Sequence, residues 1–489
     1  MSRKNIAIIG SGIAGIACAI RLANSGHQVT IFEANSCPGG KLTSFTQDGY
    51  RFDAGPSLFT QPFYIDELLN LTGKNSPDIF AYTRLPIVCK YLYEDGTVIN
   101  GYADVYEFAQ EIYNKTGVAP EMVIQHLGKS AQLYKITSKV FLENSLHRFQ
   151  TYLLPDTLSA IPQLYKLNMF TTMHGANVSR FKDPKVVQLF DRFATYNGSN
   201  PYIAPATLNI IPHLEHNIGA YFPGGGMQSI TNVLYQLAKE EGVDFRFNAN
   251  VQQITVENKK AKGVVVDYDF LPYDTVISNS DVWRTYRNLM PDQTPPEKIL
   301  NRPKSSSAII FYWGINRLFP QLDLHNIFFS RDYQAEFRHI FKLGELYHDP
   351  TVYLNISSKY CPEDAPPGCE NWFVMINVSP DTGQNWAKIV AIARAHIIDK
   401  LNRILQINLH ELIVTESVLD PTGIENKTGS HQGALYGSNS NSIWSAFFRH
   451  PNFSSKISNL YFCGGSVHPG GGIPLCLQSA KIVARLIGS

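Results

Sequence analysis

The sequence predicts an α/β fold, and the two ends of the chain carry the observations that predict it. Near the N-terminus an apolar run at 5–9 leads into Gly10-Ser-Gly12-Ile-Ala-Gly15, which opens a helical pattern, and a second apolar run follows at 28–32. Near the C-terminus a third apolar run precedes a glycine-rich loop at 464–472 and a helical pattern from about 475 to 487. Strand, glycine turn and helix in this order are typical of a parallel sheet covered by helices.

The first glycine turn predicts a dinucleotide site. Gly10 permits the tight turn, Gly12 lets the backbone approach a pyrophosphate, and Gly15 lets the helix pack close to the sheet. The second apolar run ends at Glu33, whose carboxylate can accept hydrogen bonds from a ribose. The glycines alone also occur in ordinary turns, but strand, helix and spaced acid together make the pattern specific. We therefore expect a Rossmann-type domain.

Two further features favour FAD over a nicotinamide dinucleotide. Gly39-Gly40-Lys41 adds a second glycine pair and a cation, where bare amides and an ammonium can approach phosphate. Another tight turn lies at 53–58, where a nicotinamide dehydrogenase would continue into regular βαβ repeats. The alternative is two unrelated surface turns. The C-terminal loop argues against it, because its glycines leave the backbone open to a large ligand and the next helix points its positive end at the loop.

Several motifs together carry a resemblance to a known family. They are the N-terminal fingerprint, Gly39-Gly40-Lys41, Asp53-Ala-Gly-Pro56, Gly219-Ala-Tyr-Phe-Pro223-Gly224-Gly225-Gly226-Met227, Val276-Ile-Ser-Asn279-Ser-Asp281 and Gly464-Gly465-Ser466-Val-His468-Pro469-Gly470-Gly471-Gly472-Ile473-Pro474. With them nearly the whole chain resembles the carotenoid desaturases, the phytoene desaturase-like FAD flavoproteins. Gly433-Ala-Leu-Tyr-Gly437 and the 464–469 segment are more similar to the hydroxycarotenoid 3,4-desaturases. Lys41 departs from the family's usual arginine, keeping the charge but losing the bidentate fork.

The resemblance also implies where FAD binds. Val251 would meet the adenine through its backbone, and Asn279 would lie near the pyrophosphate. Together with the motif residues, the predicted cofactor-binding set is Gly10, Gly12, Ala14, Gly15, Glu33, Gly39, Gly40, Lys41, Pro56, Ser57, Leu58, Val251, Asn279, Leu435, Gly464, Gly465, Gly472, Ile473 and Pro474.

The predicted reaction removes two hydrogens from adjacent carbons of a polyene. No side chain can accept a hydride, whereas the flavin N5 can. The second hydrogen leaves as a proton, and a conjugated neighbour makes that C–H acidic enough for a weak base or water. No Ser/His/Asp or paired-carboxylate signature stands out. The candidate catalytic residues are His213, Glu215 and His468, and the alternative for each is a structural hydrogen-bonding role.

We expect a desaturase that introduces a C=C bond, most specifically the 3,4-desaturation of a hydroxylated acyclic or monocyclic (gamma-carotene-like) carotenoid. Phytoene desaturation is the nearest alternative. An amine oxidase would share the FAD scaffold, although no site for an ammonium group is recognisable, and a carotenoid carrier with structural FAD is a third alternative. Transfer of a polyene from a bilayer to a protein tunnel is nearly neutral, so selectivity depends on fit and on a polar partner for any buried hydroxyl. The sequence does not identify that partner.

Composition agrees with these expectations. A chain of 489 residues suits a cofactor domain plus a substrate domain, and a net charge of +1 gives no basic field for nucleic acid. Charged residues, at 17%, fall below the usual quarter, which fits a large apolar cavity, a membrane-facing surface or simply a large core. The seven cysteines are scattered, and Cys361 and Cys369 lack a second pair, so no metal site is expected. The fingerprint strand begins almost at once, so no signal peptide is expected.

Any membrane contact is expected to be interfacial, because no run of ~18 apolar residues is present. The best candidate is 149–170, with Lys166 as a headgroup contact and an amphipathic helix over the core as the alternative. Its apolar residues are Tyr152, Leu153, Leu154, Leu158, Ile161, Leu164, Tyr165, Leu167, Met169 and Phe170. We expect a cytoplasmic protein that associates peripherally with the inner face of a membrane.

The landmarks divide the chain into interleaved domains. Residues 1–80, 219–281 and 455–489 are expected to form the FAD-binding domain, 81–104 and 282–454 a mixed-sheet substrate domain, and 105–218 a helical, membrane-facing insertion. Within 219–281, periodicity predicts a helix at 227–241 and strands at 243–247, 251–256, 263–267 and 274–278 that complete a small sheet. Strands such as 307–313 and 372–378 are expected to form the floor of the substrate domain.

Overall fold

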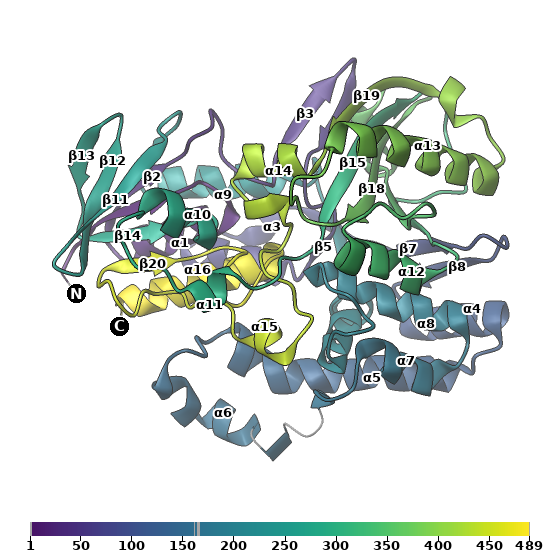
Figure 1. Ribbon diagram of the computed structural model, residues 1–489, viewed down its shortest axis with the longest axis horizontal. Coiled ribbons are helices and arrows are strands. Elements are labelled where there is room, and N and C mark those ends of the chain that lie inside the picture. The colour runs from purple at the N-terminus through teal and green to yellow at the C-terminus, as the bar shows by residue number, and fades with distance from the viewer. Residues whose placement is uncertain (1, 161, 164–166, 489) are drawn as a thin grey trace.

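A parallel sheet joins segments that lie far apart in the chain. The computed structural model describes residues 2–160, 162–163 and 167–488 (Figure 1). The sheet has the strand order β10-β2-β1-β14-β20. These strands are β1 (Asn5–Ile9), β2 (Gln28–Phe32), β10 (Asp244–Arg246), β14 (Thr275–Ser278) and β20 (Leu460–Phe462). All neighbouring strands run parallel, and each of the three segments predicted for the cofactor domain contributes at least one strand.

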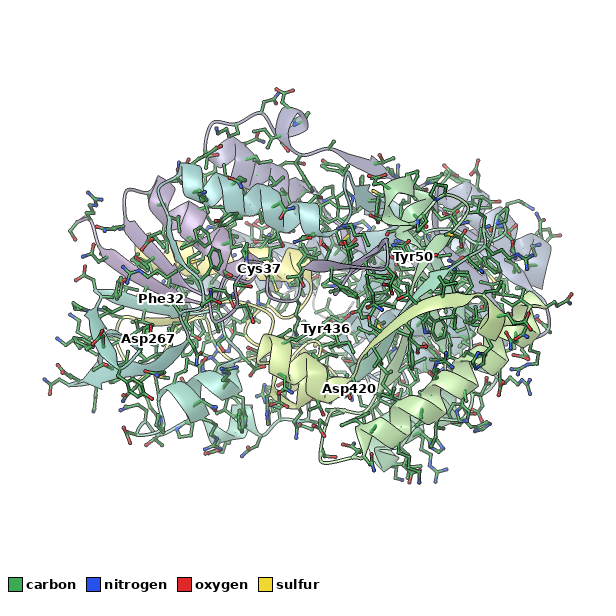
Figure 2. All side chains as sticks on the ribbon, turned by 90° about the horizontal axis from the view of Figure 1, so that it is seen from above. Phe32, Cys37, Tyr50, Asp267, Asp420 and Tyr436 are labelled. Carbon is green, nitrogen blue, oxygen red and sulfur yellow. The ribbon has the colours of Figure 1, made fainter. Side chains whose placement is uncertain are left out.

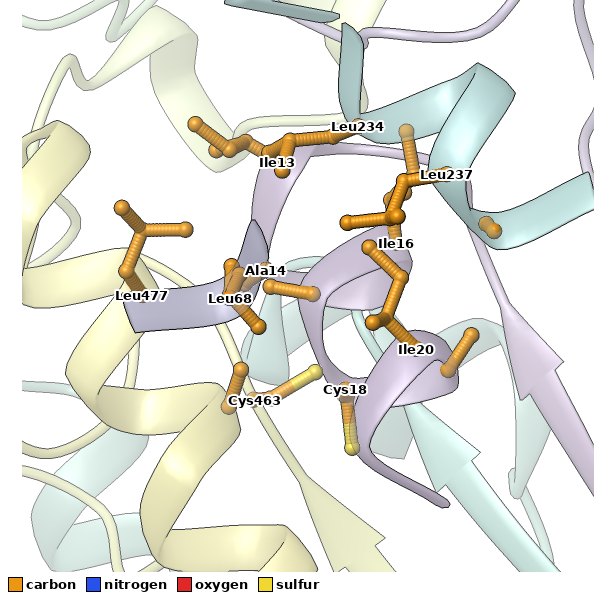
Figure 3. Close-up of a cluster of buried hydrophobic side chains, with 14 of the residues drawn as sticks. Ile13, Ala14, Ile16, Cys18, Ile20, Leu68, Leu234, Leu237, Cys463 and Leu477 are labelled. Carbon is orange, nitrogen blue, oxygen red and sulfur yellow. The ribbon is translucent and has the colours of Figure 1, made fainter. Parts of the chain in front are cut away.

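Three helices bury apolar faces in the core beside this sheet. They are α1 (Ile13–Asn24), α9 (Gln228–Glu240) and α16 (Ile473–Gly488), close to the helices expected at 227–241 and 475–487. Every residue of α1 from Ile13 to Leu22 is buried, so this helix is enclosed by its neighbours on all sides. Figure 3 shows Ile13, Ile16 and Ile20 of α1 with Leu234 and Leu237 of α9 in one cluster. Leu477 of α16 lies in the same cluster, so α1, α9 and α16 share one core.

The small sheet differs from the prediction. It contains β11 (Val251–Glu257), β12 (Lys260–Val266) and β13 (Asp269–Pro272), all antiparallel. The strands predicted at 243–247 and 274–278 were wrongly assigned to it, because β10 pairs with β2 and β14 pairs with β1. All four residues of β14 are buried, as is typical of a central strand in a parallel sheet.

A mixed sheet of seven strands forms the second lobe. Its order is β19-β15-β18-β17-β16-β7-β8, and only β16 and β7 pair in parallel. Its strands are β7 (Ile87–Leu92), β8 (Val98–Tyr102), β15 (Ser307–Ile315), β16 (His325–Phe328), β17 (Val352–Asn355), β18 (Glu370–Val378) and β19 (Ile413–Leu419). One face packs against α13 (Trp386–Leu405) through residues such as Phe311 and Val374. Because successive side chains of a strand point to opposite faces, Tyr312 and Phe373 lie on the other face of the sheet.

The part of 105–218 that the structure describes contains helices and turns. Its α-helices are α4 (Val105–Thr116), α5 (Pro120–Thr137), α6 (Pro155–Ala160), α7 (Met173–Phe181) and α8 (Pro184–Asp191). The Asp104 side chain accepts hydrogen bonds from two N–H groups of α4, and Gly117 ends this helix with φ of 75°. In Figure 1, α4, α7 and α8 lie below β7 and β8, on the opposite side of these strands from α13.

Short elements connect the two sheets. The remaining strands are β3 (Ser44–Gln47), β4 (Tyr50–Asp53), β5 (Phe59–Thr60), β6 (Tyr82–Arg84) and β9 (Ala220–Pro223). The remaining α-helices are α2 (Phe63–Leu71), α3 (Ser76–Ile79), α10 (Val282–Arg284), α11 (Glu297–Leu300), α12 (Tyr333–Arg338), α14 (Pro421–Thr428) and α15 (Ile443–Phe447). β5 and β6 both pair with β9, which brings 59–60 and 82–84 beside the 220–223 segment.

The 149–170 stretch is not one amphipathic helix. A 3-10 turn at Phe149–Leu153 is followed by the short helix α6, which begins at Pro155, and Leu154 lies between the two. Leu167 is fully buried and Met169 partly buried, whereas other apolar residues of the stretch are exposed. The predicted residues Ile161, Leu164, Tyr165 and Lys166 lie outside the described residues. Among the helices that are described, none combines the length and apolar character needed to cross a bilayer.

Candidate functional site

The fingerprint turn leaves the first turn of α1 open. Gly10 has φ of 96°, in the left-handed region that favours glycine, and α1 begins directly after Gly12. No described side chain caps this helix, and its first turn carries no acidic residue. A Cβ on Gly15 would lie 2.3 Å from the Gly10 carbonyl oxygen, so only glycine allows the close packing. The free N–H groups and the positive helix end together form a site for an anion.

Glu33 is held at the end of β2 by four hydrogen bonds. Its Oε2 accepts from the Ser11 backbone N–H at 2.8 Å and from Ser11 Oγ at 2.7 Å. Its Oε1 accepts from the Asn35 backbone N–H at 2.9 Å and from Asn35 Nδ2 at 2.8 Å. The carboxylate is 6% exposed. It therefore fixes the fingerprint turn as well as facing the end of the sheet where a ribose is predicted.

The second glycine pair packs directly on the first. Gly39 donates its N–H to the Ser11 carbonyl at 2.9 Å, and a Cβ on Gly40 would lie 3.3 Å from Gly12 Cα. The next residue, Lys41, donates from Nζ to the Leu435 carbonyl at 2.9 Å, and burial lowers the pKa of this lysine. Lys41 and Leu435, which are both predicted to bind the cofactor and lie far apart in the chain, are thus in contact.

The C-terminal loop closes over the same turn through Asn279. This side chain follows β14 and donates from Nδ2 to the Gly10 carbonyl at 3.3 Å. A Cβ on Gly12 would lie 2.8 Å from Asn279 Nδ2, and a Cβ on Gly464 would lie 2.9 Å from Asn279 Oδ1. Gly472, with φ of 107°, has no described atom within 4 Å of a Cβ position and directly precedes α16. The Asn279 side chain therefore lies between the glycines before α1 and those of the C-terminal loop.

The predicted site extends from the small sheet to the seven-stranded sheet. At one end, the Ala249 N–H donates to the Glu33 carbonyl at 2.9 Å, which places the start of β11, Val251, beside β2. At the other end, Tyr312 donates from its hydroxyl to the Ala54 carbonyl at 2.8 Å, so the segment containing Pro56, Ser57 and Leu58 lies against β15. In Figure 2, Cys37 and Tyr436 lie between Phe32 of the parallel sheet and Tyr50 of the β3–β4 hairpin.

These residues fit a flavin dinucleotide. The turn offers uncapped N–H groups, the glycines leave space that a Cβ would fill, Lys41 supplies a cation, and Glu33 supplies a buried carboxylate. Donors for the two phosphates and an acceptor for the ribose are the groups that such a cofactor requires. The assignment of each individual residue to the cofactor stays a prediction.

The three candidate catalytic residues lie in different surroundings. Glu215 is buried and forms an ion pair with Arg192, and it also accepts a hydrogen bond from the Tyr196 hydroxyl. His468 Nε2 lies 2.8 Å from the Asn144 carbonyl, and burial lowers its pKa to about 4, so the ring is neutral at pH 7. His213 Nδ1 lies 2.8 Å from Asn217 Nδ2. The structure does not bring the three together, and a catalytic role for any of them stays a prediction.

A polar cluster that no sequence motif indicated lies on the sheet face directed toward the site. Ser57 Oγ lies 2.7 Å from the Tyr353 hydroxyl, which lies 2.8 Å from His325 Nδ1. On the neighbouring strand β7, the Tyr91 hydroxyl accepts a hydrogen bond from Arg192 Nη2 at 2.6 Å. These residues come from the segment between β4 and β5, from β7, β16 and β17, and from a turn near 192, so no local motif connects them. The only sequence signal was the alternation of Tyr353 and Asn355 with apolar residues in β17.

Comparison with known proteins identifies the family. Residues 13–488 match the family described as flavin containing amine oxidoreductase. The chain is 50% identical over 487 residues, 99% of both chains, to 1-hydroxycarotenoid 3,4-desaturase of Flavobacterium sp. (strain P99-3). It is 33% identical to 4,4'-diapolycopene oxygenase of Methylomonas sp, over 98% of this chain and 97% of that protein.

Solved structures share the fold. An oxidoreductase from Methanosarcina mazei superposes with a TM-score of 0.64 at 17% identity, over 99% of both chains. A triple mutant of putrescine oxidase gives a TM-score of 0.64 at 14% identity, over 99% of this chain and 98% of that chain. These identities support the fold alone, whereas the family match spans both lobes. The chain therefore belongs to the family of flavin-containing amine oxidoreductases, and its cofactor is FAD.

Proposed function

We propose that this protein is an FAD-dependent carotenoid desaturase that forms the 3,4 double bond of a hydroxylated acyclic or monocyclic carotenoid. The observation that carries the proposal is the 50% identity to a 1-hydroxycarotenoid 3,4-desaturase across 99% of both chains. The site supports it, because the residues that fit a flavin dinucleotide lie beside a sheet face with many aromatic side chains. The 33% identity to carotenoid oxygenases supports the same substrate class.

Bound FAD supplies the hydride acceptor that desaturation requires. The chain's own residues would hold that cofactor: the starts of α1 and α16 would bind the phosphates, and Glu33 would accept a hydrogen bond from the ribose. Beside Ala54, Tyr312 packs against Phe45 and Phe373 with ring centroids 5.0 and 5.6 Å apart. Both ring pairs are edge-to-face, and this aromatic cluster offers apolar contacts to a polyene.

We assign no general base to the described residues. Glu215 is engaged by the Arg192 guanidinium, and the neutral His468 ring is tied to the Asn144 carbonyl. A proton next to a conjugated chain is acidic once the hydride has left, so water or a weak base suffices for its removal. The chain's contribution to this step is to orient the polyene and to keep competing nucleophiles away.

We also propose that the protein takes its substrate from the inner face of a membrane, as a peripheral cytoplasmic protein. The support is a group of exposed apolar side chains in the described part of 149–170. Their exposed fractions are 77% for Phe149, 59% for Leu153, 52% for Leu158 and 96% for Phe170. Apolar side chains at such exposure are suited to the boundary between headgroups and acyl chains.

Product analysis tests the proposed function. The protein is expressed in cells that accumulate one carotenoid at a time, and a hydroxylated acyclic carotenoid, its non-hydroxylated analogue and phytoene are compared. We expect the hydroxylated substrate to lose two hydrogens at the 3,4 position and to absorb at longer wavelength. Conversion of phytoene alone would favour the phytoene desaturase alternative, and no conversion of any carotenoid would contradict the proposal.

A further inference from the structure

One face of the seven-stranded sheet carries three polar residues at adjacent positions. Tyr353 and Asn355 of β17 point to the same face because they are two residues apart in a strand. The register pairs His325 of β16 with Asn355, so the imidazole and the amide are cross-strand neighbours. His325 is 3% exposed and Asn355 is 5% exposed. This group therefore lies inside the protein, on the side of the sheet that Ser57 contacts.

The hydrogen bonds fix the protonation of His325. Tyr353 OH lies 2.8 Å from His325 Nδ1, and Asn355 Nδ2, which can only donate, lies 3.2 Å from the same nitrogen. Nδ1 must therefore accept, so Tyr353 also donates to it and the ring proton is on Nε2. Burial lowers the pKa of His325 to about 4, so this ring is neutral at pH 7 and Nε2 carries its single N–H.

This N–H has no acceptor among the described residues. His325 Nε2 is a buried atom without a hydrogen-bond partner. The charged groups that act on the ring are Glu215 and Arg192, and they already bond to each other. An acceptor that reaches this buried N–H would stabilise it, and a bound molecule can supply one. The donor is linked through Tyr353 to Ser57, in the segment predicted to contact FAD.

We propose that His325 Nε2 donates a hydrogen bond to the hydroxyl oxygen of the carotenoid substrate, which makes His325 the residue that selects hydroxylated end groups. This inference rests on the proposed function. The numbering of a 1-hydroxycarotenoid places three covalent bonds between the oxygen and carbon 3, a span of at most about 4 Å. The group that binds the hydroxyl must then lie near the cofactor, and His325 is linked through Tyr353 to Ser57, which is predicted to contact FAD. A substrate without the hydroxyl leaves Nε2 unpaired and is disfavoured.

The test compares substrate preference in His325→Phe, using the FAD-loaded enzyme and a 1-hydroxycarotenoid beside the same carotenoid without its hydroxyl. We expect the ratio of the two kcat/KM values to fall by about two- to tenfold, the value of one neutral hydrogen bond. His325→Gln restores an N–H donor and should recover part of the ratio. FAD content is measured in each variant and is expected to match the parent.

His126→Phe is the matched control. His126 is also buried, at 6% exposure, and its Nε2 is likewise unpartnered, but it packs against Phe181 and Phe190 in the helical layer. Its substitution should leave the ratio unchanged. If His325→Phe does not fold, Tyr353→Phe replaces it, because this change removes the donor that fixes the tautomer and should lower the ratio several-fold.

The outcomes separate this inference from the proposed function. An unchanged ratio in a folded His325→Phe enzyme would overturn the role of His325. If His325→Phe does not fold, an unchanged ratio in Tyr353→Phe has the same meaning. An equal loss of activity on both carotenoids would also overturn this role. A parent enzyme that desaturates no carotenoid would instead contradict the proposed function, and that result is seen before any variant is made.

Discussion

Among single residues, Gly12 gives the sharpest prediction for cofactor binding. A Cβ at this position would already lie 2.8 Å from Asn279 Nδ2, and the valine methyls would fill the space beside the uncapped turn of α1. We expect purified Gly12→Val to contain no FAD, measured by its visible absorption. Gly128→Val is the control, because no described atom lies within 4 Å of a Cβ there. A yellow Gly12→Val protein with the parental FAD ratio would contradict the assignment.

Glu33 gives a second prediction at the ribose end. Glu33→Ala removes an acceptor that also holds Ser11 and Asn35, so both the ribose contact and the turn are weakened. We expect FAD affinity to fall by about 1.5–3 kcal/mol, the range for hydrogen bonds to a charged group. The dissociation constant is measured by FAD fluorescence, with Glu257→Ala on an exposed strand end as the control. Equal constants for Glu33→Ala and the parent would show that the carboxylate does not bind the cofactor.

The roles that sequence motifs suggested for individual residues differ in how far the structure supports them. The glycine contacts and the pairing of Asn279 with the first turn follow the motifs, because each motif encodes a local backbone conformation. Glu215 illustrates the opposite case. Its place beside the glycine-rich loop suggested chemistry, but its partner Arg192 lies 23 residues away and no local pattern connects them.

Among the secondary-structure elements, the segment containing Leu153 and Leu158 carries the membrane prediction. Leu153→Asp combined with Leu158→Asp places two carboxylates where apolar side chains are 59% and 52% exposed. Desolvating them at the headgroup boundary costs a few kcal/mol in total, so sedimentation with liposomes should fall sharply while bound FAD stays constant.

The matched control for membrane binding lies on β19. Val414→Asp combined with Val418→Asp changes two residues that are 53% and 46% exposed, on the edge strand of the seven-stranded sheet. It should sediment like the parent protein. If the Leu153 and Leu158 variant also sediments like the parent, this segment does not contact the membrane.

Element positions were predicted better than element pairing. The periodic patterns gave α9 and α16 within about two residues, because buried faces recur along a helix. The partner of β14 could not be read in the same way, since an apolar run of four residues fits either a parallel sheet or a small antiparallel one. The pairing is decided by β1 and β20, which lie hundreds of residues apart in the chain.

For the intact protein, buried neutral histidines predict acid sensitivity. Burial lowers the pKa of His126 to about 3 and that of His216, His325, His450 and His468 to about 4. Below pH 6.5 these histidines take up protons in the unfolded chain but not in the folded chain. Their effect on the free energy of unfolding is therefore absent well above pH 6.5, and the free energy of unfolding falls as the pH drops toward 4. At pH 5 each such histidine lowers the free energy of unfolding by about 2 kcal/mol.

Thermal melting between pH 7 and pH 5 measures this effect. Burial raises the pKa of Asp191, Glu336 and Asp364, which opposes the histidines, so the parent curve alone does not isolate them. His126→Phe removes one titrating group, and its melting temperature should fall less than that of the parent over this range. Identical slopes would show that His126 does not contribute.

The central claim is that this flavoprotein oxidises a hydroxylated carotenoid. The most direct measurement mixes the FAD-loaded protein, without oxygen, with liposomes that contain a 1-hydroxycarotenoid, and follows the flavin absorption while the product is analysed by mass. We predict that the flavin bleaches and that one carotenoid per flavin loses two hydrogens. An unbleached flavin in the presence of bound carotenoid, or bleaching by an amine but not by carotenoid, would contradict the claim.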